Sequence, residues 1–243
     1  MNFYPIFWKD MLLIRKKPWR FIATSMVMPL LYLITFGWGL GRAMRMDGGS
    51  YLEFVLPGIL ALSAMNNSFG PVSTSVNVSK LYTKTIEEVL VSPVGPWSVA
   101  FGRALTGLVR GMFSALLLLA VAAVAGVRIH LSLSFFIVLA LTAFCFASAA
   151  VAAAMVAKSH EDMANFNSFF IVPMSFLAGT FFKPDSLPEP IKSAVLVYPL
   201  THASLLLREL ASGKGPSLAS ALILLAYTAF FFYLAGRMVK RAV

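Results

Sequence analysis

The sequence predicts an all-α integral membrane protein with six transmembrane helices in one domain, residues 1–243. Two observations favour this class: 59% of the residues are hydrophobic and only 12% are charged, whereas soluble domains carry about 25% charged residues. A third is that apolar runs of about 20 residues, the length that crosses a bilayer, recur along the chain. Six such runs use about half of the chain and leave short connections, with no room for a second folded domain.

The candidate spans are apolar runs with charged residues at or beyond their ends. The first follows a basic N-terminus, as in a signal peptide, but no small-residue cleavage pattern follows it, so we interpret it as a retained span. The second run is unusually polar for a span. We place the six spans at about 21–41, 54–79, 104–125, 133–156, 166–182 and 218–236.

Basic residues are distributed unevenly between the two sides that six spans create. The side of the termini carries thirteen Lys and Arg residues and the other side seven, with five acidic residues on each. Cytoplasmic segments of membrane proteins are enriched in Lys and Arg. Without the polar second span, the basic N-terminus and the basic tail would lie on opposite faces. We therefore retain that span and expect both termini in the cytoplasm.

Residues 3–17 predict an amphipathic helix in the cytoplasmic interface. Its apolar residues at helical spacing are Phe3, Phe7, Met11 and Ile14. Cations such as Arg15 are placed to contact lipid phosphates, and Pro18 ends the helix. The alternative is a basic flank that only sets the orientation of the first span; the aromatic residues, which suit a membrane interface, favour the helix.

The cytoplasmic loop 80–103 predicts a short amphipathic helix that stops at the prolines Pro93 and Pro96. Four side chains share its apolar face: Tyr82, Ile86, Val89 and Leu90. The charged Lys84, Glu87 and Glu88 lie elsewhere on it. An exposed apolar face indicates a partner. Lipid headgroups and a docked soluble subunit explain the pattern equally well, and both remain open at this point.

The external segment 183–216 is too rich in proline for one continuous helix. Its stretches 191–198 and 200–211 are nevertheless apolar enough to lie at the membrane surface or to dip into it. Irregular backbone at membrane depth is tolerated where protein buries it. We expect re-entrant or interfacial helices that form an external cap.

A polar stripe runs along the second span at helical spacing. Its members are Ser63, Asn67, Gly70, Thr74 and Asn77, with Asn66 beside them. Polar groups that face lipid are costly, so the stripe faces protein or a water-accessible cavity. Helix packing is favoured for Gly70. A translocation path, shared with Asn167 at the start of the fifth span, is favoured for Asn66 and Asn67.

Catalytic and metal-binding patterns are weak in this sequence. His160 and Glu161 begin like a zinc motif, but Ala164 replaces the second histidine. We expect His130 and His202 to be solvated or interfacial. The single Cys145 lies in an apolar run and can form no disulfide or cysteine cluster within one chain. We therefore expect no enzyme activity, no bound metal and no cofactor.

The energy source of a transporter is likewise missing from the sequence. Every Asp and Glu lies in a predicted loop or at a helix edge, so no proton or sodium relay is indicated. The sequence has no G-x-x-x-x-G-K-[ST] phosphate loop. The basic residues behind the formal charge of +10 lie beside apolar segments, so membrane topology explains this charge. We therefore expect no nucleic-acid partner.

Several motifs resemble the type-2 ABC transporter permeases, over essentially the whole chain. They are YLEFVLPG at 51–58, TIEEVLVSP at 85–93, the Arg110-Gly111 pair and the Phe181-Phe182 pair before the proline-rich segment. The TIEEVLVSP loop, between the second and third spans, is the most specific of them. The chain is most similar to small bacterial permeases grouped with drug-resistance and nodulation-factor exporters.

This resemblance implies roles for the predicted segments. Residues 3–17 would be an interface helix, 86–90 part of a coupling helix that contacts the ATPase subunit through Glu87 and Glu88, and 191–211 re-entrant helices. Two ATPase copies, which bind ATP and magnesium, would join two permeases, the second being another copy or a paralogue. The complex would export a drug, lipid or lipid-linked glycan across the bacterial inner membrane. The alternative is a membrane scaffold or assembly factor without transport activity.

Overall fold

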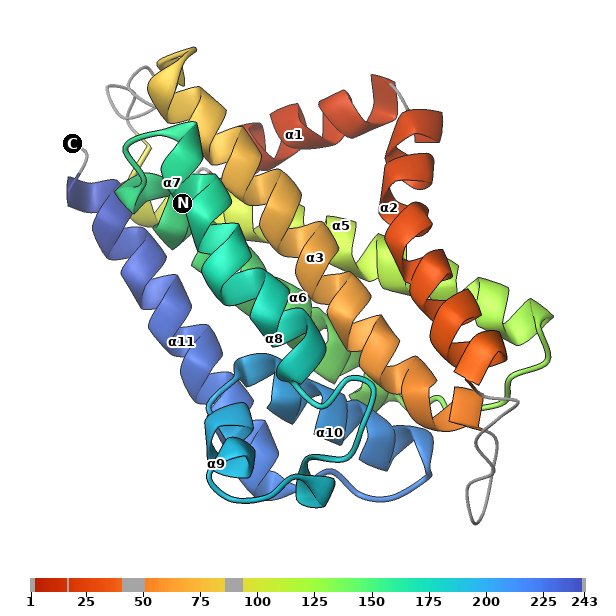
Figure 1. The fold of residues 1–243 in the computed structure, drawn as a ribbon. Coiled ribbons are helices and arrows are strands. Elements are labelled where there is room, and N and C mark those ends of the chain that lie inside the picture. The colour runs from red at the N-terminus through yellow and green to blue at the C-terminus, as the bar shows by residue number, and fades with distance from the viewer. Residues whose placement is uncertain (1–2, 17, 41–50, 86–93, 242–243) are drawn as a thin grey trace.

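The computed structural model describes residues 3–16, 18–40, 51–85 and 94–241, and every regular element in these ranges is helical. Figure 1 shows the long helices lying side by side in one bundle. In chain order the elements are α1 (Tyr4–Lys16), α2 (Pro18–Tyr32), η1 (Leu33–Leu40), α3 (Tyr51–Leu81), α5 (Pro96–Val124), α6 (Leu133–Val156), α7 (His160–Phe166), η2 (Asn167–Ile171), α8 (Val172–Leu177), η3 (Pro184–Ser186), α9 (Ile191–Leu196), α10 (Pro199–Ala211) and α11 (Leu218–Arg241).

Three of the described helices, α5, α6 and α11, are long and apolar enough to cross a membrane, and Phe21–Thr35 is a shorter apolar helix. The all-helical membrane class is therefore confirmed. α3 has 31 residues and a length of about 46 Å, but its polar stripe lowers its hydropathy. The six-span topology itself remains a prediction.

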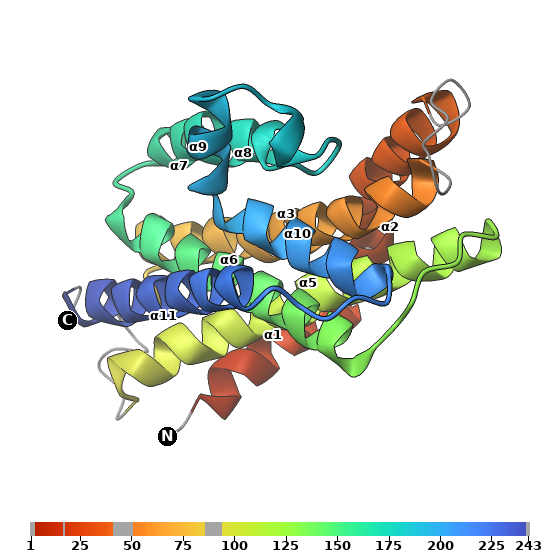
Figure 2. The same ribbon diagram turned by 90° about the horizontal axis from the view of Figure 1, so that it is seen from below.

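The chain termini and the α9–α10 segment lie at opposite ends of the bundle. Phe3 packs edge-on against Phe101 of α5, and Trp97 of the same helix packs against Tyr233 near the end of α11. The first and last helices therefore meet at the start of α5, and both views place the termini near one end of the molecule (Figures 1 and 2). α10 lies at the other end.

The observed helix bounds agree with the prediction for the fourth span, which is α6 at 133–156. The third differs, because α5 begins at Pro96 and not at 104. Pro96 occupies the first turn, where its missing N–H breaks no intrahelical bond. Part of the predicted loop 80–103 is thus the beginning of a long helix, and the sixth predicted span extends to Arg241 as α11.

The fifth predicted span is not one helix. It consists of α7, the π-helical η2 and α8, and it ends at Leu177 instead of 182. Pro173 lies in the first turn of α8, where it has no N–H to continue the preceding α-helical hydrogen bonds. The first predicted span has a similar change of register, since α2 contains Pro29 and continues as the π-helical η1. Such π segments are often found at functional sites.

Local capping explains where α7 begins. The Ser159 side chain accepts a hydrogen bond from the backbone N–H of Asp162, and the Asp162 carboxylate accepts one from the N–H of Ser159. This reciprocal arrangement is a capping box. His160 and Glu161, the residues that resemble a zinc motif, form the first turn of this capped helix.

Glycines on α5, and not Gly70 on α3, provide the close helix packing. A Cβ added at Gly111 would lie 2.7 Å from the Ala64 carbonyl oxygen, and one at Gly107 would overlap Ala147. At Gly70 an added Cβ meets no atom within 4 Å. The packing role that we expected for Gly70 is therefore wrong: the small residues that let α3, α5 and α6 approach lie on the neighbouring helix.

Candidate functional site

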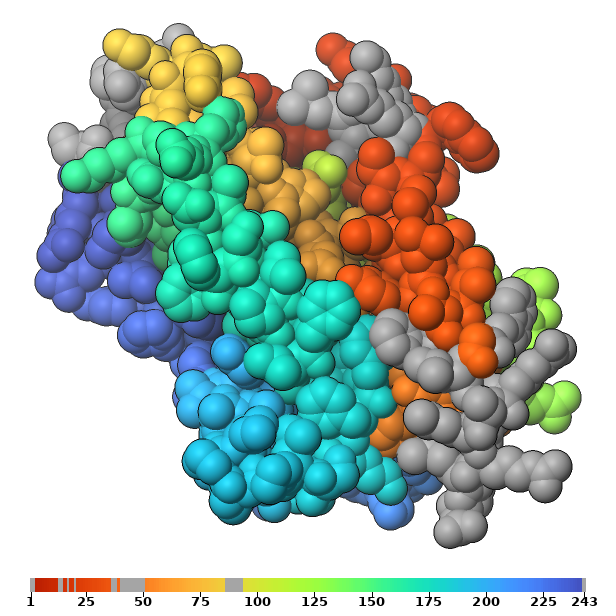
Figure 3. Space-filling view, in the orientation of Figure 1, coloured from red at the N-terminus to blue at the C-terminus, as the bar shows by residue number. Residues whose placement is uncertain are grey.

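A cavity of about 440 Å³ lies between α2, α3 and the broken fifth segment η2–α8. In Figure 3, α3 is visible in orange behind the gap between α2 and α8. The wall combines apolar side chains with a few polar ones. The lining residues are Thr24, Met28, Pro29, Tyr32, Leu62, Ser63, Asn66, Asn67, Pro71, Asn167, Ile171, Val172, Ser175 and Phe176.

The structure brings together four of the six residues that we predicted for a translocation path. Ser63, Asn66 and Asn67 of α3 face Asn167 of η2 across this cavity. Thr74 and Asn77 do not line it. Thr74 is exposed, and Asn77 is fully buried with its amide 3.5 Å from the Ser159 carbonyl oxygen. Because α3 is longer than the cavity, only part of the polar stripe lines the cavity and the rest lies beyond it.

Ser63 and Asn67 are also part of a polar cluster that joins three helices. Ser63 Oγ lies 2.8 Å from Ser114 Oγ of α5, and Asn67 Nδ2 donates to the same hydroxyl at 2.9 Å. Ser114 in turn donates to the Ser25 carbonyl oxygen of α2 at 3.0 Å. These hydrogen bonds have few competitors in an apolar surrounding, so the cluster fixes α2, α3 and α5 relative to one another.

Asn66 and Asn167 differ from that cluster. Both lie on the cavity wall, and neither side-chain amide has a hydrogen-bond partner among the described residues. Asn66 is partly buried and Asn167 is exposed, so these two amides are available to water or to a ligand in the cavity. The site thus offers polar groups within an otherwise apolar wall, which suits an amphipathic molecule.

Arg208 of α10 joins three segments near the start of α3, a role that the sequence did not indicate. Its guanidinium donates to the carbonyl oxygens of Phe54 (3.2 Å), Phe182 (3.3 Å) and Thr180, and it lies 4.2 Å above the Phe54 ring. These contacts fasten the segment after α8 to the start of α3. A single arginine in an apolar helix is the signal that could have identified it, since such residues are rarely buried without partners.

The opposite end contains the beginning of the predicted coupling loop. Tyr82 is 65% exposed and its ring stacks on His160 with centroids 5.1 Å apart. Lys80 Nζ donates to the carbonyl oxygens of Met155 (2.6 Å) and Ala157 (2.8 Å) at the end of α6. The other predicted coupling residues, Ile86, Glu87, Glu88, Val89 and Leu90, lie outside the described residues.

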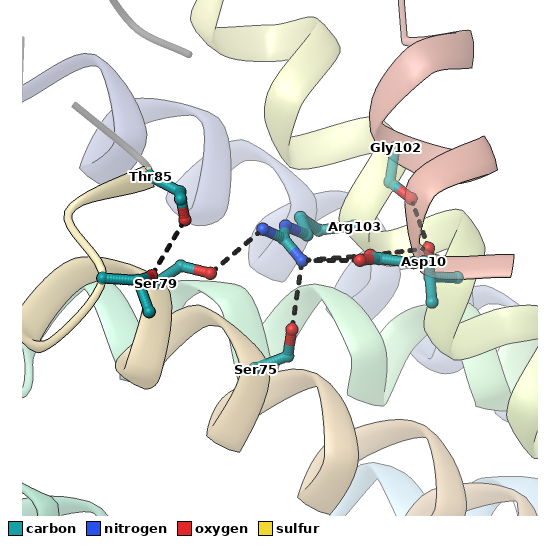
Figure 4. Close-up of polar contacts among 8 residues, drawn as sticks. Asp10, Ser75, Ser79, Thr85, Gly102 and Arg103 are labelled. Atoms are coloured by element: carbon teal, nitrogen blue, oxygen red, sulfur yellow. Dashed lines mark hydrogen bonds and ion pairs between the residues drawn. The ribbon is translucent and has the colours of Figure 1, made fainter. Parts of the chain in front are cut away.

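The helix predicted at 3–17 is α1, and it packs against α5. Phe7 and Met11 are partly buried, and Arg15 is exposed. The face in contact with α5 contains Ile6 and Asp10, which are each 8% exposed. Figure 4 shows the Asp10 carboxylate beside the Arg103 guanidinium. The helix is therefore joined to the bundle by a buried charge in addition to its apolar side chains.

Histidine and cysteine side chains form no metal site in the described part of the chain, where no three His, Cys, Asp or Glu residues lie close enough to hold an ion. His202 is 5% exposed, and its Nε2 lies 2.9 Å from the Leu196 carbonyl oxygen. Our expectation that it is solvated or interfacial is wrong, because α10 packs into the bundle. His130 is exposed, as expected.

The described part of the chain thus combines long apolar helices with a cavity that has both polar and apolar walls. The chain belongs to the ABC-2 type transporter family, whose pattern matches residues 1–210. The predicted family is thereby confirmed.

Characterised relatives support the same assignment. The chain is 27% identical over 160 residues to the inner membrane transport permease YadH of Escherichia coli strain K12, a match that covers 65% of this chain and 62% of that relative. It is 27% identical over 203 residues to nodulation protein J of Rhizobium meliloti, covering 81% and 78% of the two chains. The nodulation protein J of Rhizobium leguminosarum bv. viciae is 26% identical over 234 residues, with 88% and 83% covered.

Proposed function

We propose that this chain is the permease subunit of an ATP-driven exporter that moves an amphipathic or hydrophobic compound across the bacterial inner membrane. The observation that carries the proposal is the cavity between α2, α3 and η2–α8, in which Asn66 and Asn167 offer free amides within an apolar wall. Family membership adds the coupling to an ATPase. A drug, a lipid and a lipid-linked glycan all have this mixture of polar and apolar groups.

The proposed topology has six spans with both termini in the cytoplasm. α2–η1, α3, α5, α6, α7–α8 and α11 are the spans, and α9 and α10 form the external cap. The described cations at the end of the termini include Lys84, Lys158 and Lys240, all exposed, as the bias toward positive cytoplasmic segments requires. The inner membrane location is proposed from the similarity to YadH, an inner membrane transport permease.

In the proposed mechanism, a movement of the loop after α3 is transmitted to the cavity wall. Two ATPase subunits bind the loop 82–90 of two permease copies and move it when they bind and hydrolyse ATP with magnesium. Lys80 holds the end of α3 against the end of α6, directly before α7. A displacement of the loop therefore acts on α3 and α7–α8 together, which are two of the three walls of the cavity.

The π segments allow those walls to move. η1 and η2 interrupt the regular hydrogen bonding of the first and fifth spans: η2 lines the cavity, and η1 begins directly after Tyr32 on its wall. A change of helical register at these points lets the two halves of each span tilt separately. Arg208 holds the external end until such a tilt separates Thr180 and Phe182 from α10.

The direct test is co-expression and co-purification with a candidate ABC ATPase subunit, such as one encoded by a neighbouring gene. We expect a stable complex that hydrolyses ATP and, in inverted vesicles, accumulates an amphipathic fluorescent substrate. Replacement of both coupling glutamates (E87A/E88A) should dissociate or uncouple the complex and leave membrane insertion intact. Glu161→Ala is the matched control, because Glu161 is an exposed acid at the same end of the bundle.

Two results would contradict the proposal. A complex with full ATP-dependent transport in E87A/E88A would remove the coupling role of the loop. A chain that inserts but never binds an ATPase and moves no substrate would support the scaffold alternative.

A further inference from the structure

A second and larger cavity lies on the other side of the α7–α8 segment. It has a volume of about 680 Å³, within the range of small-molecule sites, and it is lined by α3, α6, α7, η2, α8 and α11. In Figure 3 the blue α11 lies on the side of α7–α8 away from α2. Ile171 lines this cavity and the candidate path alike. The fifth segment is therefore a thin partition between two cavities.

The lining of the second cavity changes from apolar to charged along its length. Its walls are made by residues such as Phe69, Phe146 and Phe231, whereas Lys158 and Asp162 lie at the end where α6 meets α7. An apolar groove with charge at only one end matches a molecule that has an apolar chain and a polar head.

The length of the groove matches the thickness of the hydrocarbon region of one bilayer leaflet. The α6 residues on the wall run from Phe146 to Val156, which is eleven residues and about 15 Å of helix. Half of the hydrocarbon core of a membrane is about 15 Å thick. A groove of this length extends from the polar surface to about the middle of the membrane, the depth reached by one acyl chain.

The charge at the polar end favours an anionic head. Lys158 is exposed and forms no ion pair with a described residue. Asp162 is already engaged, because its Oδ2 accepts hydrogen bonds from the backbone N–H groups of Lys158 (2.8 Å) and Ser159 (3.1 Å). The Asp162 carboxylate keeps its charge but is held at the start of its own helix, whereas the Lys158 ammonium has no partner among the described residues and complements a lipid phosphate.

We infer that this groove binds an anionic phospholipid of the cytoplasmic leaflet, with one acyl chain between α6, α7–α8 and α11 and the phosphate at Lys158. The leaflet follows from the proposed topology, whereas the binding itself is independent of the transport proposal. A chain in the groove packs against Met163, Phe166 and Phe170. It would therefore brace the partition and make the path sensitive to the lipids around the protein.

The test measures lipid retention by the purified full-length chain with native mass spectrometry. Dioleoylphosphatidylglycerol and dioleoylphosphatidylcholine are the two probes, each added in mixed micelles. We expect the anionic lipid to be retained in preference to the zwitterionic one. Lys158→Gln should weaken retention of phosphatidylglycerol about fivefold, the effect of one cation near a lipid surface. Lys240→Gln, an exposed lysine at the same end, should leave it unchanged.

A second pair of variants tests the groove itself. Ala153 lies on its wall, and Ala153→Trp would fill the space of several methylene groups, so retention should fall more than tenfold. Ala229→Trp, on an exposed site of α11 outside the groove, and Ser175→Trp, in the candidate path, should retain the lipid. The Ser175 variant separates this site from the transport path.

Three outcomes would overturn the inference. Equal retention in Ala153→Trp and Ala229→Trp would show that no chain enters the groove. Unchanged retention in Lys158→Gln would remove the anionic head from the site. Loss of a permease dimer in Ala153→Trp with unchanged lipid retention would assign the groove to a second copy of the chain.

Discussion

Asp10 of α1 and Arg103 of α5 form an ion pair, although the two residues are 93 positions apart in the sequence. Nη1 of Arg103 lies 3.0 Å from both carboxylate oxygens, and each side chain is only 9% exposed. Ser75 and Ser79 of α3 accept further hydrogen bonds from the same guanidinium, at 3.1 and 3.3 Å. One arginine of α5 therefore joins α1 to α3, the helix that leads into the coupling loop.

Breaking this ion pair on one side should destabilise the protein. Asp10→Asn leaves the Arg103 charge buried without its counter-ion, which costs about 3–5 kcal/mol. Replacement of both residues by apolar ones (D10L/R103M) should restore most of the loss, since an apolar pair needs no compensation. Thermal unfolding in detergent measures both. A double variant less stable than the single one would show that the surrounding hydroxyls require the charge.

Close packing of α5 predicts opposite effects of alanine at two glycines. Gly111→Ala places a Cβ 2.7 Å from the Ala64 carbonyl oxygen and 2.9 Å from Ala143 Cβ, so we expect a loss of about 1–3 kcal/mol. Gly70→Ala meets no atom within 4 Å and should be neutral or stabilising by about 0.5–1 kcal/mol, because alanine favours the helix. Denaturation of the two variants side by side checks this, and equal losses would contradict it.

The polar stripe of α3 should separate into a packing part and a path part. Ser114→Ala removes the hydroxyl that bonds Ser63, Asn67 and the Ser25 carbonyl, and it should cost about 1–3 kcal/mol of stability. Asn66→Leu removes an amide without a partner among the described residues and should change stability by less than about 0.5 kcal/mol. Transport by the reconstituted complex should nevertheless fall severalfold in Asn66→Leu. Normal transport there would exclude Asn66 from the path.

The six-span topology predicts which exposed sites react from outside the cell. Cys145 is buried, so Cys145→Ala provides an unreactive background. In that background, H130C and K214C should react with a membrane-impermeant maleimide on intact spheroplasts. K84C and K240C should react only after permeabilisation. Labelling of K240C on intact cells would place the C-terminus outside and contradict the even number of spans.

Hydropathy predicted the long helices better than it predicted their internal breaks. The bounds of α6 agree with the prediction because a continuous apolar run and a capping serine, Ser132, define them locally. The fifth span was predicted as one segment because most of its residues are apolar. Its division at Asn167 and Pro173 depends on hydrogen-bond register, to which hydropathy is insensitive.

Part of the candidate site could be predicted from the sequence. Helical spacing placed Ser63 and Asn67 on one face of α3, and the cavity lies against that face. The same spacing included Thr74 and Asn77, which lie beyond the cavity. Periodicity gives the direction of a side chain from its own helix, but the extent of a cavity depends on where the neighbouring helices begin and end.

The sequence by itself determined the all-helical membrane class, the family and the lack of ATP-binding motifs, because these depend on composition and on contiguous residues. Only the tertiary structure decided the partners of the charges. The sequence places Asp10 in the predicted interface helix, Arg103 at the end of a predicted cytoplasmic loop and Arg208 in an external segment, yet all three are fixed by contacts with distant residues. A buried charge requires a partner that its own segment does not contain, so its role is set by the packing of helices and not by the residues beside it.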